Sequence, residues 1–350
     1  MSAVFLDFST LSVGDLDVSG LQAAAPGLRL LEMTTQDEVA AMIAGCQIVM
    51  LNKLQIPREV IAGAHELKLI VLSATGTNNV DLGAARDHGV AVCNITDYCT
   101  ASVVQHVLGV MLSLTQKLPQ YSRDAVDGTW AKSPHFTCLV HPIRELRGRT
   151  LGIVGYGVLG KAVAEACRSA LGMQVIVAER AGTAAPIGSN TTRAADGAQT
   201  PLEERVPLDE LLARADVVSL HCPLTPTTTG LIDARRLRLM KSDALLINTA
   251  RGGLVDVEAL AHSLRTGQLG GAAIDVLPRE PPVDGSPLFA PDLPNLIVTP
   301  HTAWACSACF FWAAAAYTPS WRRSPCASKT CSPARWSPPT APMRWPRLRA

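Results

Sequence analysis

The chain has 350 residues, of which 48% are hydrophobic and 17% charged, so it can bury a large core and most simply forms two domains, which excludes a disordered or fibrous protein. Its formal net charge of +1 provides no general attraction to nucleic acid or to an anionic membrane. The charge is uneven, however, because residues 1–300 contain 24 basic and 30 acidic side chains, whereas residues 301–350 contain seven basic side chains and no carboxylate.

The N-terminus and the cysteines both indicate a protein of the cytoplasm. The first ten residues lack the basic start and long apolar core of a secretory signal, and Asp7 interrupts them early. The most apolar helical segment, 101–118, carries polar side chains such as His106 and Lys117, which favours a buried helix over a membrane span. Ten cysteines without CxxC spacing in the body of the chain indicate reduced thiols. We therefore expect a soluble protein that binds no metal, nucleic acid or membrane.

The first hundred residues alternate short β-like runs with helical segments, a rhythm typical of a parallel βαβ sheet. The β-like runs are 3–8, 48–52, 69–73 and 90–94, and the clearest helical segment is 35–44. The apolar helix 101–118 follows. The polar stretch after it, around Gly128, Trp130 and Pro134, is expected to cross between two domains.

From Thr150 the same rhythm restarts and is better marked. We expect strands at 150–154, 174–178, 217–220, 244–248, 271–275 and 296–299, and helices at 159–171, 207–213, 234–239 and 257–266. Residues 182–202 are small and polar without periodicity, and we expect them to form a surface loop. The sequence thus predicts an α/β protein with two parallel-sheet domains.

A glycine-rich turn opens the second domain. Gly155, Gly157 and Gly160 directly follow an apolar strand and begin an alanine-rich helix, and Glu179 ends the next strand. In that context the glycines allow a tight turn, the approach of a pyrophosphate and close packing of helix on strand. Glu179 would accept hydrogen bonds from the ribose of NAD and repel the 2′-phosphate of NADP, although Arg180 weakens this preference. The alternative is a purely structural turn.

Three ionisable residues follow later strands, at the edge where open α/β sheets place their ligands. Arg251 lies among small residues, Glu280 lies on a proline-rich loop after Asp275, and His301 follows the last strand. Singly, they have simpler explanations: a surface cation, a loop carboxylate and a histidine at a strand end. Together behind a dinucleotide turn they fit hydride transfer to a 2-keto acid. Arg251 would bind the substrate, His301 would donate the proton and Glu280 would orient His301.

These motifs resemble those of the D-isomer-specific 2-hydroxyacid dehydrogenases, and most closely those of their glycerate dehydrogenase (hydroxypyruvate reductase) branch. The similar stretches are 74–81 (ATGTNNVD), 155–160 (GYGVLG), 221–224 (HCPL), 248–256 (NTARGGLVD), 275–282 (DVLPREPP) and 300–304 (PHTAW). The resemblance implies two doubly wound parallel-sheet domains, Rossmann or flavodoxin-like, with a cleft between them. Residues 1–101 would form the substrate domain, 102–300 the NAD-binding domain and 301–350 an aberrant tail.

The resemblance also implies roles for individual residues. Arg251, Glu280 and His301 would be catalytic, and Arg251 would also bind substrate. The predicted cofactor contacts are Gly155, Gly157, Val158, Leu159, Gly160, Glu179, Cys222, Pro223, Thr249, Ala250, Asp275, His301 and Trp304.

Further substrate contacts are predicted in the first domain. The loop of Ala74, Thr75 and Gly76 would offer backbone N–H groups to the substrate carboxylate. Lys53 would bind the substrate's polar end, unless it is only a solvated lysine after a strand. The glycerate preference rests on these residues and on the HTAW ending.

Two features depart from the family pattern. Relatives usually have a glutamate where Gln105 precedes His106, and we expect only a small local effect. After Ala305 the resemblance stops, because the tail contains four of the ten cysteines, four of the six tryptophans, many prolines and no carboxylate. We hypothesise a frameshift near codons 305–307, so that another reading frame of the gene should encode an amphipathic helix. A natural basic tail that binds a partner is the alternative.

The sequence therefore predicts a cytoplasmic, homodimeric, NADH-linked reductase of hydroxypyruvate or glyoxylate, with NADP as the less favoured cofactor. Another D-2-hydroxy acid is the nearest alternative substrate. A different class of function is an NAD-binding interaction module, or an enzyme that its altered tail impairs. Substrate-dependent oxidation of NADH distinguishes these hypotheses.

Overall fold

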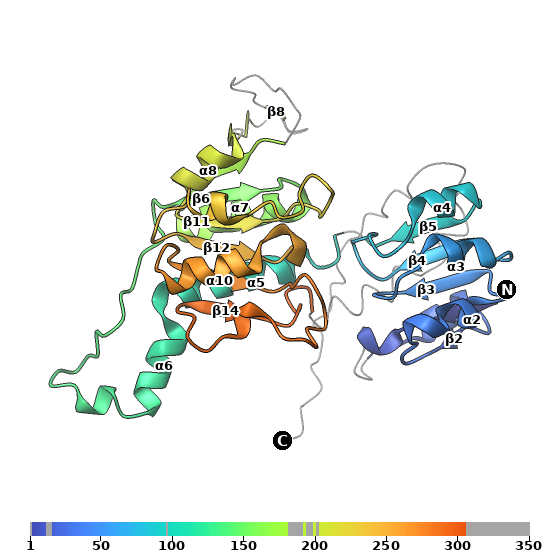
Figure 1. Ribbon diagram of the computed structural model, residues 1–350, viewed down its shortest axis with the longest axis horizontal. Coiled ribbons are helices and arrows are strands. Elements are labelled where there is room, and N and C mark those ends of the chain that lie inside the picture. The colour runs from blue at the N-terminus through green and yellow to red at the C-terminus, as the bar shows by residue number, and fades with distance from the viewer. Residues whose placement is uncertain are drawn as a thin grey trace. The chain divides into compact units, whose positions relative to one another are not determined.

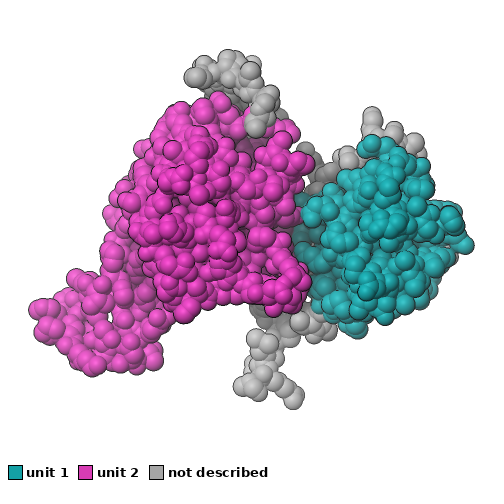
Figure 2. Space-filling model, in the orientation of Figure 1, with its two compact units in different colours: residues 1–98, 307–350 teal, residues 99–306 magenta. Residues whose placement is uncertain are grey.

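Two compact units make up the protein. The computed structural model describes residues 2–11, 16–95, 97–180 and 203–305, and the backbone of 192–193 and 199–200. The chain divides between Tyr98 and Cys99, and Figure 2 shows the two units in teal and magenta. Each unit is built on its own parallel sheet with helices packed beside it (Figure 1). The prediction of an α/β protein with two parallel-sheet domains is confirmed.

The first unit contains a five-stranded sheet in the order β2-β1-β3-β4-β5, with every neighbouring pair parallel. Its strands are β1 (Ala3–Phe5), β2 (Arg29–Leu30), β3 (Ile48–Leu51), β4 (Leu69–Leu72) and β5 (Ala91–Asn94). Its helices are α1 (Ser19–Ala24), α2 (Val39–Ile43), α3 (Arg58–Gly63) and α4 (Leu82–Asp87), with 3₁₀ turns at Phe8–Thr10 and Gln36–Glu38. This strand order is that of flavodoxin-like folds.

Both faces of this sheet carry buried apolar side chains. On one face, Val49, Ile70 and Leu72 pack in one core with side chains of α2, α3 and α4. The residues between them along the strands point to the opposite face. Phe5 and Met50, on the other face, are 1% and 4% exposed. Strands that are buried on both faces read as continuous apolar runs, which is why β3 and β4 were readily predicted.

The second unit contains a seven-stranded parallel sheet in the order β10-β7-β6-β11-β12-β13-β14. Its strands are β6 (Thr150–Val154), β7 (Gln174–Ala178), β10 (Glu204–Val206), β11 (Val217–Leu220), β12 (Leu245–Asn248), β13 (Gly271–Ile274) and β14 (Leu296–Val298). A separate antiparallel pair joins β8 (Thr192–Arg193) and β9 (Gln199–Thr200). The large sheet has the Rossmann strand order with one further strand at its edge, and that order reverses between β6 and β11.

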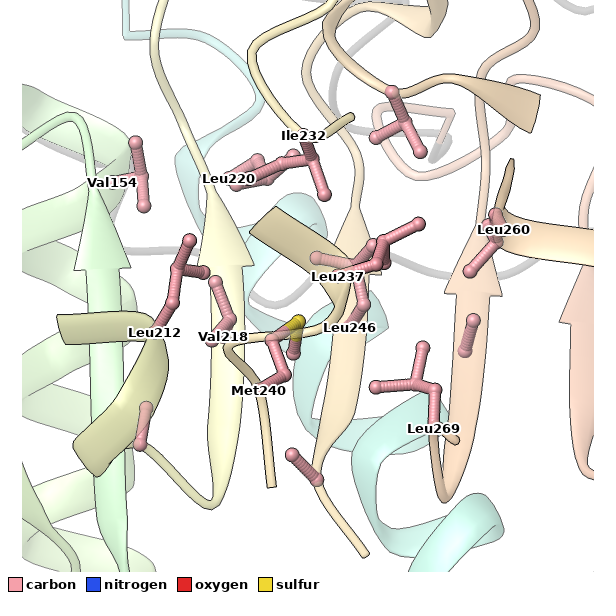
Figure 3. Packing of buried hydrophobic residues seen from close by; sticks show 14 of the residues in the cluster. Val154, Leu212, Val218, Leu220, Ile232, Leu237, Met240, Leu246, Leu260 and Leu269 are labelled. Carbon is pink, nitrogen blue, oxygen red and sulfur yellow. The ribbon is translucent and has the colours of Figure 1, made fainter. Parts of the chain in front are cut away.

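Helices lie beside the second sheet, and the last three described helices bury one of its faces in a continuous apolar core. The helices are α5 (Thr100–Gln116), α6 (Leu118–Val126), α7 (Val158–Leu171), α8 (Leu208–Arg214), α9 (Ala234–Leu237) and α10 (Val257–Arg265), with 3₁₀ turns at Trp130–Lys132, Gly252–Leu254 and Pro287–Phe289. Figure 3 shows Val218 and Leu246 of the sheet packed with Leu212, Leu237 and Leu260 of the helices. All five are fully buried, and each such side chain stabilises the fold by roughly 1.5–3 kcal/mol.

Three expectations need correction. The helix expected at 101–118 ends at Gln116, because Lys117 adopts a left-handed conformation with φ of +55° and α6 begins after it. The segment 35–44 starts as a 3₁₀ turn under a Thr35–Glu38 capping box before α2. The polar stretch around Trp130 lies inside the second unit, since the chain divides before α5.

Some expectations concern residues that are not described. The loop expected at 182–202 falls mostly outside the described residues, although its backbone forms β8 and β9. The chain from 306 onward also lies outside them, so the frameshifted tail stays a hypothesis. Among the described helices, none combines the length and hydropathy that a membrane crossing requires.

Candidate active site

The glycine-rich turn lies where the strand order of the second sheet reverses. Gly155 follows β6 with φ of +100°, and a Cβ on it would lie 2.5 Å from the backbone nitrogen of Cys222, just after β11. A Cβ on Gly160, in the first turn of α7, would collide with the carbonyl oxygen of Gly155. Contacts within the chain therefore require both of these glycines.

Gly157 differs, because its surroundings in the described chain do not require a glycine. Its φ is −84°, and a Cβ on it would meet no atom within 4 Å. The turn is thus open at Gly157, and α7 begins at the next residue. The first N–H groups of a helix lack intrahelical partners and attract anions, so this turn fits the pyrophosphate of a dinucleotide.

Other predicted cofactor residues line the same carboxyl edge of the sheet. Glu179 follows β7, Cys222 and Pro223 follow β11, and Thr249 and Ala250 follow β12. Burial raises the pKa of the Cys222 thiol, so the thiol is neutral at physiological pH. Thr249 Oγ1 is buried and has no hydrogen-bond partner in the described part of the chain. An unpaired hydroxyl of this kind costs about 1–3 kcal/mol, which a ligand at this edge would recover.

His221, beside this edge, is predicted to make the protein less stable in acid. Its Nε2 lies 2.8 Å from Ser219 Oγ, and burial lowers the pKa of His221 to about 4. A histidine in the unfolded chain has a pKa near 6.5. Between about pH 6.5 and pH 4, His221 is therefore protonated in the unfolded state but neutral in the native state, so the free energy of unfolding falls as the pH is lowered through this range. Urea unfolding across this range should show a loss of at most about 3 kcal/mol from this group.

The His221→Gln variant should lose this part of the pH dependence. His262→Gln, at an exposed position on α10, is the matched control and should keep it. An unchanged pH dependence in His221→Gln would contradict the assignment.

Asn248 braces the loop that carries Arg251. The Asn248 side chain is fully buried, donates from Nδ2 to the Arg251 carbonyl at 2.9 Å and accepts from the Ala250 N–H at 3.0 Å. The Arg251 guanidinium donates to the Ala250 carbonyl at 2.6 Å, and no carboxylate of the described residues forms an ion pair with it. A Cβ on Gly252 would collide with the Leu277 backbone, so this loop packs directly on the loop after β13.

His301 and Glu280 form a close pair. His301 Nδ1 lies 2.6 Å from Glu280 Oε2, and the other carboxylate oxygen accepts from the Leu277 N–H at 2.8 Å. The side chains of His301 and Glu280 are 26% and 34% exposed. A proton on Nδ1 fits the carboxylate, which leaves Nε2 to exchange a proton with a ligand. This is the arrangement of an oriented general acid or base.

Asp275 holds the backbone around His301. Its carbonyl accepts from the His301 N–H at 2.8 Å, and its buried carboxylate accepts from the N–H groups of Thr302 and Ala303 at 2.9 and 3.0 Å. Trp304, the last predicted cofactor contact, follows directly and is partly exposed. Three neighbouring parallel strands, β12, β13 and β14, therefore deliver Arg251, Glu280 and His301 to one edge of the second sheet.

In the first unit, Asp7 fixes the loop that carries Lys53. The Asp7 side chain is 1% exposed and accepts from the N–H groups of Asn52 and Lys53 at 2.8 and 2.7 Å. The Lys53 side chain itself is exposed. A rigid backbone with an exposed amine is suited to a polar ligand.

The loop after β4 carries the other predicted substrate residues. Ala74 is buried and accepts from the Ile95 N–H, and the Thr75 carbonyl accepts from the Asn94 amide at 2.7 Å. The N–H groups of Thr75 and Gly76 donate to no acceptor within the described part of the chain. Adjacent free N–H groups can bind a carboxylate.

The positioning residues were not identified from the sequence. In the sequence, Asp7 is only an interruption of an apolar run, and Asn248 is only the first residue of the 248–256 motif. A buried polar residue at the end of an apolar strand was the available signal. Gln105, where the family pattern is broken, is exposed on α5.

Comparison with known proteins places the chain in a family. Residues 108–303 match the family model described as "D-isomer specific 2-hydroxyacid dehydrogenase, NAD binding domain". The chain is 42% identical to a glycerate dehydrogenase of Methylorubrum extorquens, over 77% of this chain and 80% of that protein. It is 33% identical to a hydroxypyruvate reductase of Blautia hydrogenotrophica, over 87% and 91%. The TT0316 protein of Thermus thermophilus has a similar structure, with a TM-score of 0.75 and 33% identity over 91% of this chain and 94% of that one.

Proposed function

The chain belongs to the D-isomer-specific 2-hydroxyacid dehydrogenases, which are NAD-dependent oxidoreductases, and from this premise we propose that it reduces hydroxypyruvate or glyoxylate to D-glycerate or glycolate. The observation that carries the catalytic assignment is the His301–Glu280 pair at the same edge of the sheet as Arg251, an arginine with no carboxylate partner among the described residues. The names of the two relatives support the choice of substrate.

In the proposed mechanism His301 is the acid that completes the reduction. Bound NADH supplies a hydride to the carbonyl carbon of the substrate. The carbonyl oxygen gains negative charge as its double bond opens, and the proton on His301 Nε2 moves to that oxygen. Glu280 holds Nδ1 and stabilises the cationic ring before the proton leaves. In the oxidative direction neutral His301 accepts the hydroxyl proton.

Arg251 is proposed to bind the substrate carboxylate and to polarise its carbonyl. One N–H of the guanidinium donates to the Ala250 carbonyl, which fixes the plane of the guanidinium. Its other N–H groups can donate to the substrate carboxylate. In the first unit, we assign carboxylate binding to the loop of Ala74, Thr75 and Gly76, and binding of the substrate's polar end to Lys53. The free N–H groups of Thr75 and Gly76 support this assignment.

The residues of the glycine turn fit the dinucleotide that this family uses. We assign the pyrophosphate to Gly155, Gly157, Val158, Leu159 and Gly160, and the adenosine ribose to Glu179, which favours NAD over NADP. Further contacts are assigned to Cys222, Pro223, Thr249, Ala250, Asp275, His301 and Trp304. The orphaned Thr249 hydroxyl and the open side of Gly157 support these assignments.

A substitution at Gly157 should weaken cofactor binding without unfolding the protein. In Gly157→Ala the new methyl group would point into the open side of the turn, where the pyrophosphate is expected, and the Kd for NADH should rise at least about tenfold. Fluorescence titration measures the Kd, and the thermal midpoint should stay unchanged. Gly63→Ala, which also meets no atom within 4 Å, is the control. Normal NADH affinity in Gly157→Ala would place the cofactor elsewhere.

The exposed arm of the second unit supports a homodimer. From the last residue of α6 onward the chain carries a series of large apolar side chains, of which Val126, Phe136 and Leu139 are 88%, 91% and 80% exposed. Figure 1 shows α6 extending from the body of this unit. Such an apolar surface is costly in water and fits the same surface of a second copy.

The double substitution Phe136→Asp and Leu139→Asp should therefore convert a dimer into a monomer, since each introduces a charge at the proposed interface. Light scattering coupled to size-exclusion chromatography measures the change. Met33→Asp, at an apolar position of the first unit that is 62% exposed, should leave the dimer intact. A wild-type chain that is monomeric at micromolar concentration would refute the proposal.

A turnover assay tests the proposed function, which we place in the cytoplasm. The purified chain should oxidise NADH with hydroxypyruvate or glyoxylate faster than with pyruvate or phenylpyruvate, and faster than it oxidises NADPH. A preference for another 2-keto acid would change the proposed substrate but not the proposed reaction, the reduction of a 2-keto acid by NADH. Binding of NADH with no turnover of any of the four would favour an NAD-binding module or an impaired enzyme.

A further inference from the structure

A histidine with no assigned role lies behind the loop that carries His301. His106, on α5, places Nε2 3.3 Å from Oγ1 of Thr299 and 3.9 Å from Oδ1 of Asp275. The side chains of His106 and Asp275 are 18% and 1% exposed. The helix α5 packs against β13 and β14, beside which Figure 1 shows it. The cluster therefore joins α5 to the ends of two strands of the candidate site.

The hydrogen-bond pattern determines where the His106 proton lies. The Thr299 hydroxyl has one hydrogen and donates it to Asp275 Oδ1 at 2.5 Å. Thr299 Oγ1 can then only accept from His106, so Nε2 must carry a proton. A neutral ring of this kind has its lone pair on Nδ1. His106 is thus a donor to the Thr299–Asp275 pair in either protonation state.

Asp275 of this pair holds the backbone of His301 and of the two residues that follow it. Asp275 accepts the N–H groups of Thr302 and Ala303 through its carboxylate and that of His301 through its carbonyl. No lysine or arginine of the described residues forms an ion pair with Asp275. The Asp275 carboxylate is therefore held in place by hydrogen bonds. One of them comes from the Thr299 hydroxyl, which in turn accepts a hydrogen bond from His106.

We propose that His106 is a positioning residue for the proposed reaction: its Nε2–H fixes Thr299 and Asp275, and through them the orientation of His301. This inference rests on the proposed function. An imidazole that is displaced by about 1 Å transfers its proton poorly, whereas the binding of the substrate by Arg251 is not affected. Loss of the N–H should consequently lower kcat more than it changes KM.

Two variants separate the hydrogen bond from simple packing. His106→Leu fills the same space without a donor and should lower kcat about tenfold, with KM for hydroxypyruvate within about twofold of the wild type. His106→Gln keeps an N–H at the same distance along the side chain and should restore kcat to within about threefold. Gln105→Leu, at the exposed neighbouring position, should behave as the wild type. A wild-type kcat in His106→Leu, or equal impairment in His106→Gln, would overturn the proposal.

A double-mutant cycle and a spectroscopic measurement test the pathway. Thr299→Val removes the hydroxyl that receives the N–H, so its effect should not add to that of His106→Leu, and additive effects would overturn the proposed connection. If the leucine variant fails to fold, ¹⁵N NMR of the wild-type imidazole decides instead. A protonated Nε2 at neutral pH is expected, and a neutral ring protonated on Nδ1 would overturn the proposal. The NMR measurement does not depend on turnover. An inactive wild type with a protonated Nε2 would therefore refute the proposed function but not the position of the His106 proton.

Discussion

Replacing His301 with asparagine should lower kcat for hydroxypyruvate reduction by about 10³-fold, with the Kd for NADH within about twofold of the wild type. The reason is chemical: the alkoxide that forms on hydride transfer needs a proton, and His301 Nε2 is the proposed donor. Asparagine is similar in size and polarity but cannot supply a proton at neutral pH. Steady-state kinetics measures kcat, and fluorescence titration measures the Kd.

The control for this substitution is His262→Asn. His262 lies exposed on α10 of the same unit, so its replacement removes an imidazole without touching the candidate site. Its kcat should equal that of the wild type. If His301→Asn turned over at more than a tenth of the wild-type rate, His301 would not be the proton donor. If the variant lost both turnover and NADH binding, His301 would have a structural role instead.

Replacing Arg251 with lysine should raise the KM for hydroxypyruvate and lower kcat/KM by about 10²-fold, which is about 3 kcal/mol of transition-state stabilisation. Lysine keeps the positive charge but lacks the planar pair of donors that matches a carboxylate. It also cannot maintain both the Ala250 contact and a bidentate contact to the substrate. Glutamine, which removes the charge as well, should cost more.

The matched control is Arg238→Lys, at the exposed end of α9. This variant should have wild-type kinetic constants. If Arg251→Lys kept the wild-type KM and kcat/KM, the guanidinium would not be the substrate's cation, and the proposed orientation of the keto acid would be wrong. If its Kd for NADH rose in parallel, the arginine would act on the cofactor.

Most strands of both sheets were predicted because buried parallel strands leave a simple pattern, although the two-residue edge strand Arg29–Leu30 was not expected. Runs such as 150–154, 174–178 and 217–220 agree with the strands of the structure at both ends. The short edge strand Glu204–Val206 was missed, since two of its three residues are charged and its pairing with β7 is decided by tertiary structure. Helix α6 was also missed, because only one left-handed residue, Lys117, separates it from α5; Pro119 in its first turn was the available signal.

The residues of the candidate site were easier to select from the sequence than the residues that support them. Arg251, Glu280 and His301 carry side chains whose reactivity is visible in a sequence, and each follows a predicted strand. The sequence already pairs Glu280 with His301, and the structure brings the two side chains into contact. The bracing of the Arg251 loop by Asn248 was not predicted, because it depends on contacts that form only in three dimensions. Gly252 shows the difference: in the sequence it is only one of the small residues around Arg251, whereas the structure requires a glycine there because the Leu277 backbone leaves no room for a side chain.

Transfer of deuterium from NADH to the product would establish the proposed reaction of this chain. The purified chain should be incubated with NADH that carries deuterium at both C4 positions and with hydroxypyruvate, and the product analysed by NMR and chiral chromatography. The expected product is D-glycerate with one deuterium at C2. L-glycerate, product without deuterium at C2, or no product from a protein that still binds NADH would each contradict it.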